Sequence, residues 1–244
     1  MQVASPPREN ADAKGGHSMA SSRGLLPLVV ALANVAAFAE EPKPATSYFD
    51  PGLDLRYRYE GVEQEGFASD ADANTLRIRA NLALREHLGF SGLLEVDHIE
   101  AVGSQDYNDT RNGNTEFPVV ADPEGTDLNQ LWLQYAPRAD TRFRLGRQRL
   151  NLDNERFIGS VGWRQNEQTL DAIRIETTAL AKVAVNYAFV DRVNRVFGPD
   201  AGTPPETLEG ASHLLNVKWS PGAAGFLVAY AYLLDFDEAP QLSS

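Results

Sequence analysis

A two-residue alternation runs through most of this chain, and it pairs arginine with aliphatic and aromatic side chains. In residues 141–150, Arg142 and Arg144 alternate with Phe143 and Leu145. A period of two indicates a β-strand whose two faces meet different surroundings. A face of arginine opposite a face of apolar residues is typical of a strand between lipid and a polar lumen. The pattern therefore predicts an antiparallel transmembrane β-barrel.

Nine segments from residue 53 onward show strand-like patterns. We expect strands at 53–60, 72–84, 90–102, 127–136, 141–150, 168–177, 182–190, 212–219 and 225–234. The connections alternate between short ones, such as 137–140, and long ones, such as 103–126. Short turns at one end of a sheet and long loops at the other are typical of outer-membrane barrels. The fold class expected is all-β, with strands running up and down in chain order.

The apolar face of these segments is expected to contact lipid. Aromatic residues often fall near the segment ends, as the two membrane interfaces require. The expected lipid-facing residues include Leu55, Ile78, Leu131 and Val185, together with Phe226, Val228, Tyr230, Tyr232 and Leu234 in the last segment.

The opposite face predicts a charged lumen in which bases outnumber acids, while the long loops are acidic. A positive lumen with low-dielectric walls concentrates anions, and a guanidinium group forks onto carboxylates. The expected lumen-lining residues are Arg56, Arg58, Arg77, Arg79, Arg142, Arg144, Arg147, Arg174, Lys218, Glu95 and Asp97. An alternative is a barrel wall cross-linked by salt bridges, and this is the role expected for Glu95 and Asp97.

The side taken by Arg147 stays open at this point. Strict alternation puts Arg147 with Leu145, facing lipid. A bulge at Gly146 would turn it toward the lumen.

Residues 19–39 have the order of a secretory signal peptide. Arg23 precedes an apolar run over 25–38, and Ala37-Phe38-Ala39 follows as a cleavage site. We predict cleavage after Ala39 and no ordered contact between residues 1–39 and the barrel. N-terminal sequencing of the mature protein checks this, and a start upstream of Arg23 would contradict it.

The remaining domain boundaries follow from the leader and the first strand. Residues 1–18 are expected to be disordered, or to be upstream sequence included by a misassigned start, since Met19 begins a better leader. Residues 40–52 are expected to form a periplasmic segment before a barrel spanning 53–244.

Composition narrows the function classes. The 244 residues have a formal net charge of −12, which argues against a nucleic-acid partner. They contain no cysteine, which fits a protein that crosses the periplasm. The residue patterns contain no nucleophile elbow, metal-spaced histidine cluster or phosphate loop, so we expect neither catalysis nor a cofactor. Two alternatives stay open: a barrel-embedded hydrolase acting on lipid or polysaccharide, and a soluble periplasmic β-rich binding protein.

Four short motifs together resemble the alginate export family of bacterial outer-membrane porins. They are Gly146 to Gln148, Arg156-Phe157-Ile158-Gly159, Trp163-Arg164-Gln165-Asn166 and Leu170-Asp171-Ala172-Ile173-Arg174. The resemblance runs from about Leu53 to the end of the chain. It implies an outer-membrane channel with a basic pore for an anionic polysaccharide. The function expected is passive diffusion of an anionic or polar solute, with an acidic polysaccharide such as alginate as one candidate.

An odd number of strands predicts an incomplete barrel. Bacterial single-chain barrels have even strand numbers, and the resemblance implies about twice as many strands as we count. Unpaired edges at 53–60 and 225–234 would face lipid at a high energetic cost. We therefore expect a curved, partly closed sheet that belongs to a larger barrel.

Overall fold

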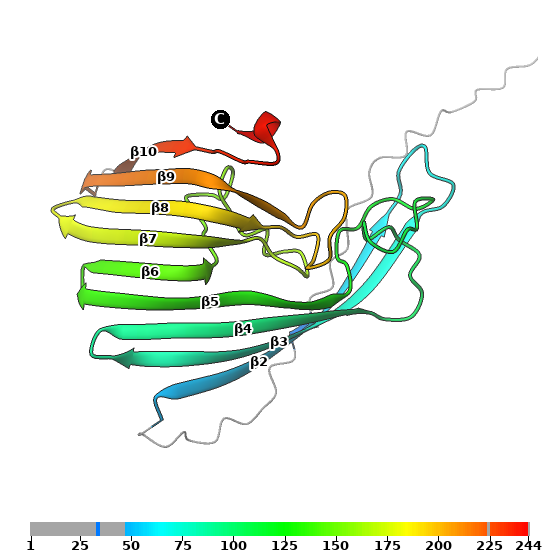
Figure 1. The fold of residues 1–244 in the computed structure, drawn as a ribbon, viewed down its shortest axis with the longest axis horizontal. Helices are drawn as coiled ribbons and strands as arrows, with labels where there is room; N and C mark the ends of the chain where they lie inside the picture. The colour runs from blue at the N-terminus through cyan, green and yellow to red at the C-terminus, as the bar shows by residue number, and fades with distance from the viewer. Residues whose placement is uncertain (1–32, 35–46, 224, 244) are drawn as a thin grey trace, which may run out of the picture.

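Each strand of this protein pairs with its neighbours in the sequence, and the result is one antiparallel sheet ordered β1 to β10 (Figure 1). The computed structural model describes residues 33–34, 47–223 and 225–243. The strands are β1 (Ala33–Asn34), β2 (Phe49–Val62), β3 (Ala71–His87), β4 (Phe90–Ala101), β5 (Gly125–Arg138), β6 (Thr141–Gln148), β7 (Thr169–Leu180), β8 (Val183–Asn194), β9 (Thr207–Gly222) and β10 (Gly225–Leu233). Within the described residues, no helix has the length and hydropathy of a membrane span.

The nine expected strands correspond to β2 through β10, which confirms the all-β antiparallel fold. Several strands extend beyond the apolar alternation that predicted them. β2 begins at Phe49, inside the segment expected to be periplasmic, and β9 begins at Thr207 rather than at 212. A strand continues wherever its neighbour offers backbone partners, and polar end residues do not prevent this.

The two-residue strand β1 pairs with β2 through Ala33 opposite Tyr57 and Asn34 opposite Arg56. Both residues fall inside the predicted leader. The prediction that residues 1–39 make no ordered contact with the barrel is therefore wrong at these two positions. Residues 1–32 and 35–46 lie outside the described residues. They make up most of the three predicted segments 1–18, 19–39 and 40–52.

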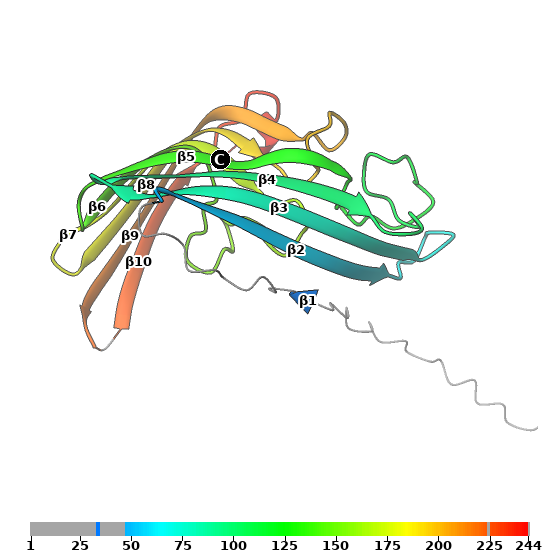
Figure 2. The same cartoon turned by 90° about the horizontal axis from the view of Figure 1, so that it is seen from below.

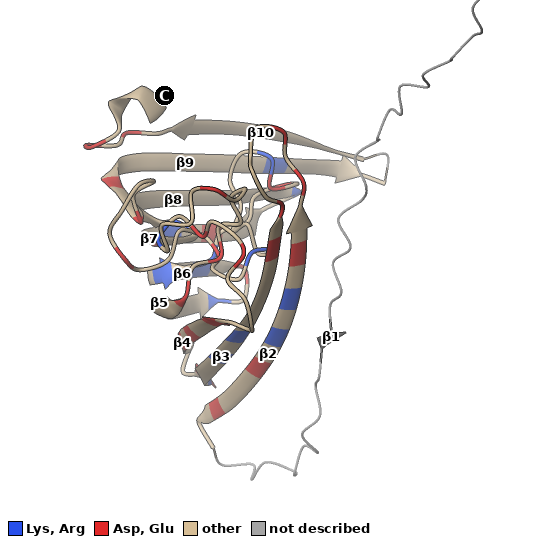
Figure 3. Cartoon of the chain, turned by 90° about the vertical axis from the view of Figure 1, so that its right-hand side faces the viewer, with Lys and Arg blue, Asp and Glu red and all other residues tan. Residues whose placement is uncertain are grey.

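The sheet is curved, and long loops occupy its concave side (Figures 2 and 3). Short connections, such as 88–89 and 139–140, lie at one end, and long ones, such as 102–124 and 149–168, lie at the other. This separation of loop lengths is as predicted. In the described part of the chain β2 and β10 do not pair with each other, so the sheet is open.

The sheet exposes apolar side chains and buries polar ones, the reverse of the arrangement in a soluble protein. On the convex face, Leu133, Leu145 and Ile173 lie opposite one another across β5, β6 and β7, and each is more than half exposed. On the concave face, Arg58 and Gln148 are buried. A continuous apolar surface over a buried polar interior is what a bilayer requires of a barrel.

β10 departs from the expected sidedness. Leu227 lies opposite Trp219, on the convex face, whereas Val228 lies opposite Lys218 and Tyr230 lies opposite Asn216, on the concave face. The assignment of Phe226, Val228, Tyr230, Tyr232 and Leu234 to lipid is therefore wrong. Both faces of β10 are apolar, so its own sequence does not show which face meets lipid. The register of its pairing with β9 determines this.

Candidate functional site

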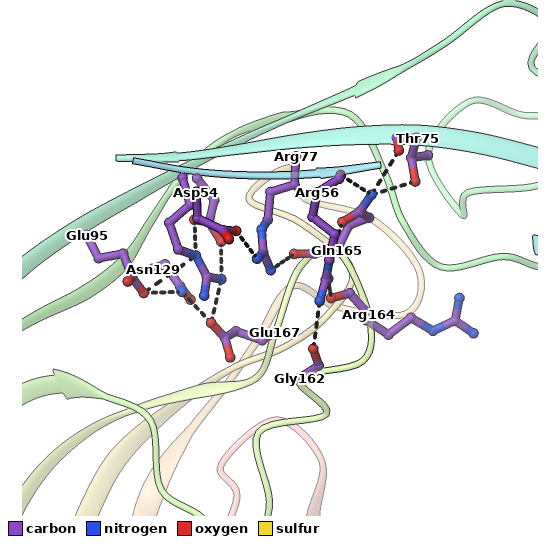
Figure 4. Close-up of polar contacts among 12 residues, drawn as sticks. Asp54, Arg56, Thr75, Arg77, Glu95, Asn129, Gly162, Arg164, Gln165 and Glu167 are labelled. Carbon is purple, nitrogen blue, oxygen red and sulfur yellow. Dashed lines mark hydrogen bonds and ion pairs between the residues drawn. The ribbon is translucent and has the colours of Figure 1, made fainter. Parts of the chain in front are cut away.

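The connection 149–168 folds back across the concave face of the sheet. Its apolar residues anchor it on β7–β9. Leu150 and Leu152 form a buried cluster with Leu170, Ala172, Ala188, Val190 and Leu214, and Ile158 packs against this cluster. The far end of the same loop, residues 162–167, reaches the concave faces of β2 and β3 (Figure 4). The loop thus bridges the two halves of the curved sheet.

Gln165 is the polar centre of this loop and is fully buried. Its Nε2 donates to the carbonyl oxygen of Thr75 at 3.0 Å and lies 2.9 Å from Thr75 Oγ1. Its Oε1 accepts from Arg56 Nε at 2.9 Å, and its backbone N–H donates to Asp122 Oδ1 at 2.9 Å. A buried amide with donor and acceptor both satisfied fixes the position of the loop.

Arg56 caps the backbone of the loop. Besides Gln165, its guanidinium donates to the carbonyl oxygen of Gly162 at 3.0 Å and to that of Arg164. The planar guanidinium carries five N–H donors, so one side chain can satisfy several carbonyls at once. Arg56 therefore holds the loop rather than standing free in the lumen.

A second loop, 102–124, supplies a carboxylate to the same network. Asp122 is fully buried and pairs with Arg58, which also pairs with Glu60. Arg164 from the 149–168 loop lies 3.1 Å from Glu60 and stacks over Trp163 at 4.2 Å. Three segments far apart in the sequence are thus tied by one ionic cluster.

Arg79 joins β3 to β4 and to the loop. It binds Asp97 through two hydrogen bonds of 2.7 Å each, and its Nη2 lies 2.5 Å from Glu167 Oε1. Its guanidinium also lies 3.7 Å from Glu95. Glu95 and Asp97 are therefore wall residues paired with arginine, the role expected for them.

Glu167 is the loop carboxylate at the centre of this second cluster. Its Oε1 accepts from Asn129 Nδ2 at 2.6 Å, and its Oε2 accepts from Arg149 Nε at 2.6 Å. Burial alone would raise the pKa of Glu167, but the hydrogen bond from Arg149 and the charges of Arg79 and Arg149 outweigh it, so the pKa is lowered. The stabilisation from Glu167 is consequently present at neutral pH and is lost as pH falls through this lowered pKa.

The network is neutral when its charges are counted together. It contains six arginines (Arg56, Arg58, Arg77, Arg79, Arg149 and Arg164) and six carboxylates (Asp54, Glu60, Glu95, Asp97, Asp122 and Glu167). The sequence predicted a positive lumen with acidic loops outside it. Here the loops fold inward and bring their acids to the strand arginines. The expected positive field does not extend to this level of the concave face.

A second group of cations lies on β6, β7 and β9, toward the short-turn end. Arg144 lies directly opposite Arg174 in the ladder, and Arg142 and Lys218 line a cleft of about 400 Å3 with Arg174. Glu176 is bound to Arg174 at 2.7 Å, whereas Arg142 and Lys218 have no ion pair within the described residues. Bases outnumber acids on the strands here, although Asp140 and Asp153 also border the cleft.

Arg147 belongs to the convex face, which corrects its placement among the lumen residues. It lies opposite Leu131 in β5, and its Nε donates to Asp171 Oδ1 at 2.8 Å. The alternation through Leu145 and Gly146 is unbroken, so no bulge turns Arg147 inward. The charge is tolerated there because Asp171 pairs with it through two hydrogen bonds.

Sequence reasoning missed the loop half of this site. Arg149, Arg164, Gln165, Glu167 and Asp122 were not among the expected lumen residues. One signal was available, because Trp163-Arg164-Gln165-Asn166 is a compact polar motif inside a long connection. Loops often carry the residues that make specific contacts, so this motif was a signal that the loop is bound to another part of the protein.

The sequence matches the model of a known protein family. This family is described as alginate export, and its model matches residues 47–189, more than half of the chain. The crystal structure of OccAB1 from Acinetobacter baumannii is similar, with a TM-score of 0.53 and 15% identity, covering 81% of this chain and 47% of that one. The chain thus spans about half the length of OccAB1, and the likeness concerns the fold alone. No curated protein matches the sequence.

Proposed function

Because this chain belongs to the alginate export family of outer-membrane channels, we propose that it passes an anionic or polar solute by passive diffusion. An acidic polysaccharide such as alginate is the first candidate. The chain reaches the outer membrane after cleavage of its leader behind Ala39. Its convex face meets lipid, and its concave face lines the solute path.

The observation that supports an anionic solute is the row of like charges on β6 and β7. Arg144 and Arg174 face each other directly across the ladder, and like charges in such a pair destabilise a sheet. Arg144 is held by Gln134 at 2.8 Å and by the ring of Trp132 at 4.1 Å, neither of which cancels its charge. Glu176 neutralises Arg174, whereas Arg142, Arg144 and Lys218 have no ion pair among the described residues, so the sheet keeps a net positive patch, which concentrates anions.

The loop network has a different role in this proposal. Its six arginines are matched by carboxylates, so the network determines the width of the solute path but not its charge selectivity. The cations toward the short-turn end, Arg142, Arg144 and Lys218, determine the preference for anions. We propose no catalysis and no cofactor. An assay of the purified protein for hydrolysis of lipid or polysaccharide separates this proposal from a barrel-embedded hydrolase.

Neutralising Arg142 and Arg144 together is expected to lower the preference for anions. In planar bilayers with a KCl gradient, the reversal potential of Arg142→Gln/Arg144→Gln should move toward the cation side. The shift should shrink in about 1 M salt, where the Debye length is about 3 Å.

The control is Arg192→Gln, which removes one positive charge from the convex side, where Arg192 pairs with Glu209 at 2.5 Å. Its reversal potential should equal that of the wild type. An unchanged potential in the double variant would reduce Arg142 and Arg144 to scaffold residues and would contradict the proposed selectivity.

A further inference from the structure

Four charged residues form a single row across the convex face, one on each strand from β6 to β9. Arg147 lies opposite Asp171, and Asp171 lies opposite Arg192. Arg192 in turn lies opposite Glu209. The four strands lie side by side, and none of them is an edge strand of the sheet (Figure 1). The charges therefore alternate in sign along a continuous row.

A β-bulge puts Arg192 on the convex face. Val190 belongs to the buried apolar cluster of the concave face, so strict alternation would place Arg192 on the concave face too. Instead, one step along β7, from Ala172 to Asp171, corresponds to two steps along β8, from Val190 to Arg192. Bulges often serve to re-aim a side chain. The regular alternation of β8 is thus interrupted at the point where the interruption completes the charged row.

The row lies at the long-loop end of the sheet. Arg147 and Arg192 are within two residues of the ends of β6 and β8, and Asp171 and Glu209 are within two residues of the starts of β7 and β9. The next convex row toward the short turns is apolar and contains Ile173. A charge on a lipid-facing strand is costly near the bilayer midplane but costs little near the interfaces, and the long loops are extracellular. A convex face in contact with lipid therefore places the charged row level with the headgroups of the outer leaflet.

The two ends of the row differ in how many of their polar atoms already have partners. The side chain of Arg147 is 17% exposed, and its nitrogen atoms all donate, two to Asp171 and Nη1 to the carbonyl oxygen of Leu128 at 3.0 Å. Arg192 directs Nε and Nη2 to one oxygen, Oε1 of Glu209. Its Nη1 makes no hydrogen bond within the described residues and lies 3.7 Å from Asp171 Oδ2. The side chain of Glu209 is 55% exposed, and its Oε2 accepts no hydrogen bond in the described part of the chain. The Arg192 end thus offers one donor and one acceptor to a partner beside the sheet.

We propose that Arg192 and Glu209 form a docking surface for a phosphorylated lipid headgroup of the outer leaflet, an inference that rests on the proposed contact of the convex face with lipid. A phosphate oxygen accepts a hydrogen bond from Arg192 Nη1, and a divalent cation that accompanies the phosphate binds Glu209 Oε2. Phosphates and their cations alternate in sign as the row does, so the two surfaces are complementary. Acyl chains would leave both groups unpaired, and phosphates without cations would be repelled by Glu209.

The test titrates the full-length protein in detergent micelles with bisphosphorylated lipid A in magnesium acetate and counts bound lipid by native mass spectrometry. Arg192→Gln is expected to weaken the first binding step about five- to tenfold, the scale of one lost contact between a basic residue and an anionic lipid. Arg192→Lys keeps the positive charge and should retain most of the affinity, which separates loss of charge from loss of folding. Lipid A without its phosphates has the same acyl chains and should bind the wild type more weakly by a similar factor.

The matched control is Arg138→Gln. Arg138 is also an exposed arginine paired with a carboxylate, that of Asp140 at 3.0 Å, but it lies at the short-turn end of the sheet. Its affinity for lipid A should equal that of the wild type. Glu209→Gln tests the cation, because the wild type should bind lipid A more tightly in magnesium acetate than in EDTA, and this variant should lose the difference.

Two results would overturn the docking surface. One is unchanged affinity for lipid A in Arg192→Gln, and the other is equal affinity of the wild type for lipid A with and without its phosphates. A wild-type dimer that Arg192→Gln abolishes, with no change in lipid affinity, would overturn it too and would assign the row to a second copy of the chain. Failure of the proposed function would appear instead as wild-type channels without anion preference in KCl, so the two failures are distinguishable.

Discussion

Replacing Asp122 by alanine is expected to release the 149–168 loop from the concave face. Asp122 is fully buried, pairs with Arg58 and accepts the backbone N–H of Gln165. Without Asp122, Arg58 and Arg164 share the single carboxylate of Glu60, which leaves one buried positive charge uncompensated, at a cost of about 3–5 kcal/mol. The free energy of unfolding in detergent should fall by that amount, and trypsin should cut rapidly after Arg156 and Arg164.

The control for this change is Asp200→Ala, which removes an exposed carboxylate from another long loop. It should leave both measurements unchanged. In the double variant Asp122→Leu/Arg58→Met, stability should partly return because neither buried charge is left alone. Wild-type trypsin resistance in Asp122→Ala would show that the ionic cluster does not hold the loop.

The second large effect is expected on the convex face. Ile78→Arg places a charge among apolar side chains that meet lipid, and near the bilayer midplane this costs about 2–4 kcal/mol. Asn81→Arg, on the same strand, lies opposite Glu95 on the concave face and should cost far less. Urea unfolding of the protein folded into lipid vesicles measures both. Equal costs for the two variants would mean that the sheet is not oriented in the membrane as described.

The strands and most of their sidedness could be predicted from the sequence because both are local. The alternation of Arg142, Phe143, Arg144 and Leu145 assigns each residue to the polar or the apolar face, and this requires no knowledge of the neighbouring strands. β10 shows where this fails. Its two faces, with Val228 and Tyr230 on one and Leu227 and Ala229 on the other, are both apolar, so hydropathy does not distinguish them. Only pairing with β9 decides between them.

The polar network could not be predicted because its partners are far apart in the chain. No local period connects Arg79 to Glu167 or Arg58 to Asp122. The strand arginines of the network, Arg56, Arg58, Arg77 and Arg79, do lie on the concave face, but the prediction of a positive lumen did not include the loop carboxylates that pair with them. The carboxylates that neutralise them arrive on loops whose path no periodicity describes. Among the residues that the structure describes, the inward-folded loops bring no carboxylate within ion-pair distance of Arg142 or Lys218, so these two cations form no ion pair there.

The distance along the chain between these partners also bears on the order of assembly. Hairpin ladders join neighbouring strands, whereas the contacts of Gln165 join it to Arg56 and Thr75, 109 and 90 positions earlier. Contacts of such wide separation form late, because a long stretch of chain must first be ordered. Strands β2 to β5 therefore enter the sheet while Arg56 still lacks Gln165 and the carbonyl oxygen of Gly162. A chain halted before residue 162 would present the Arg56 guanidinium group without these acceptors, whereas Arg58 would already have Glu60 and Asp122.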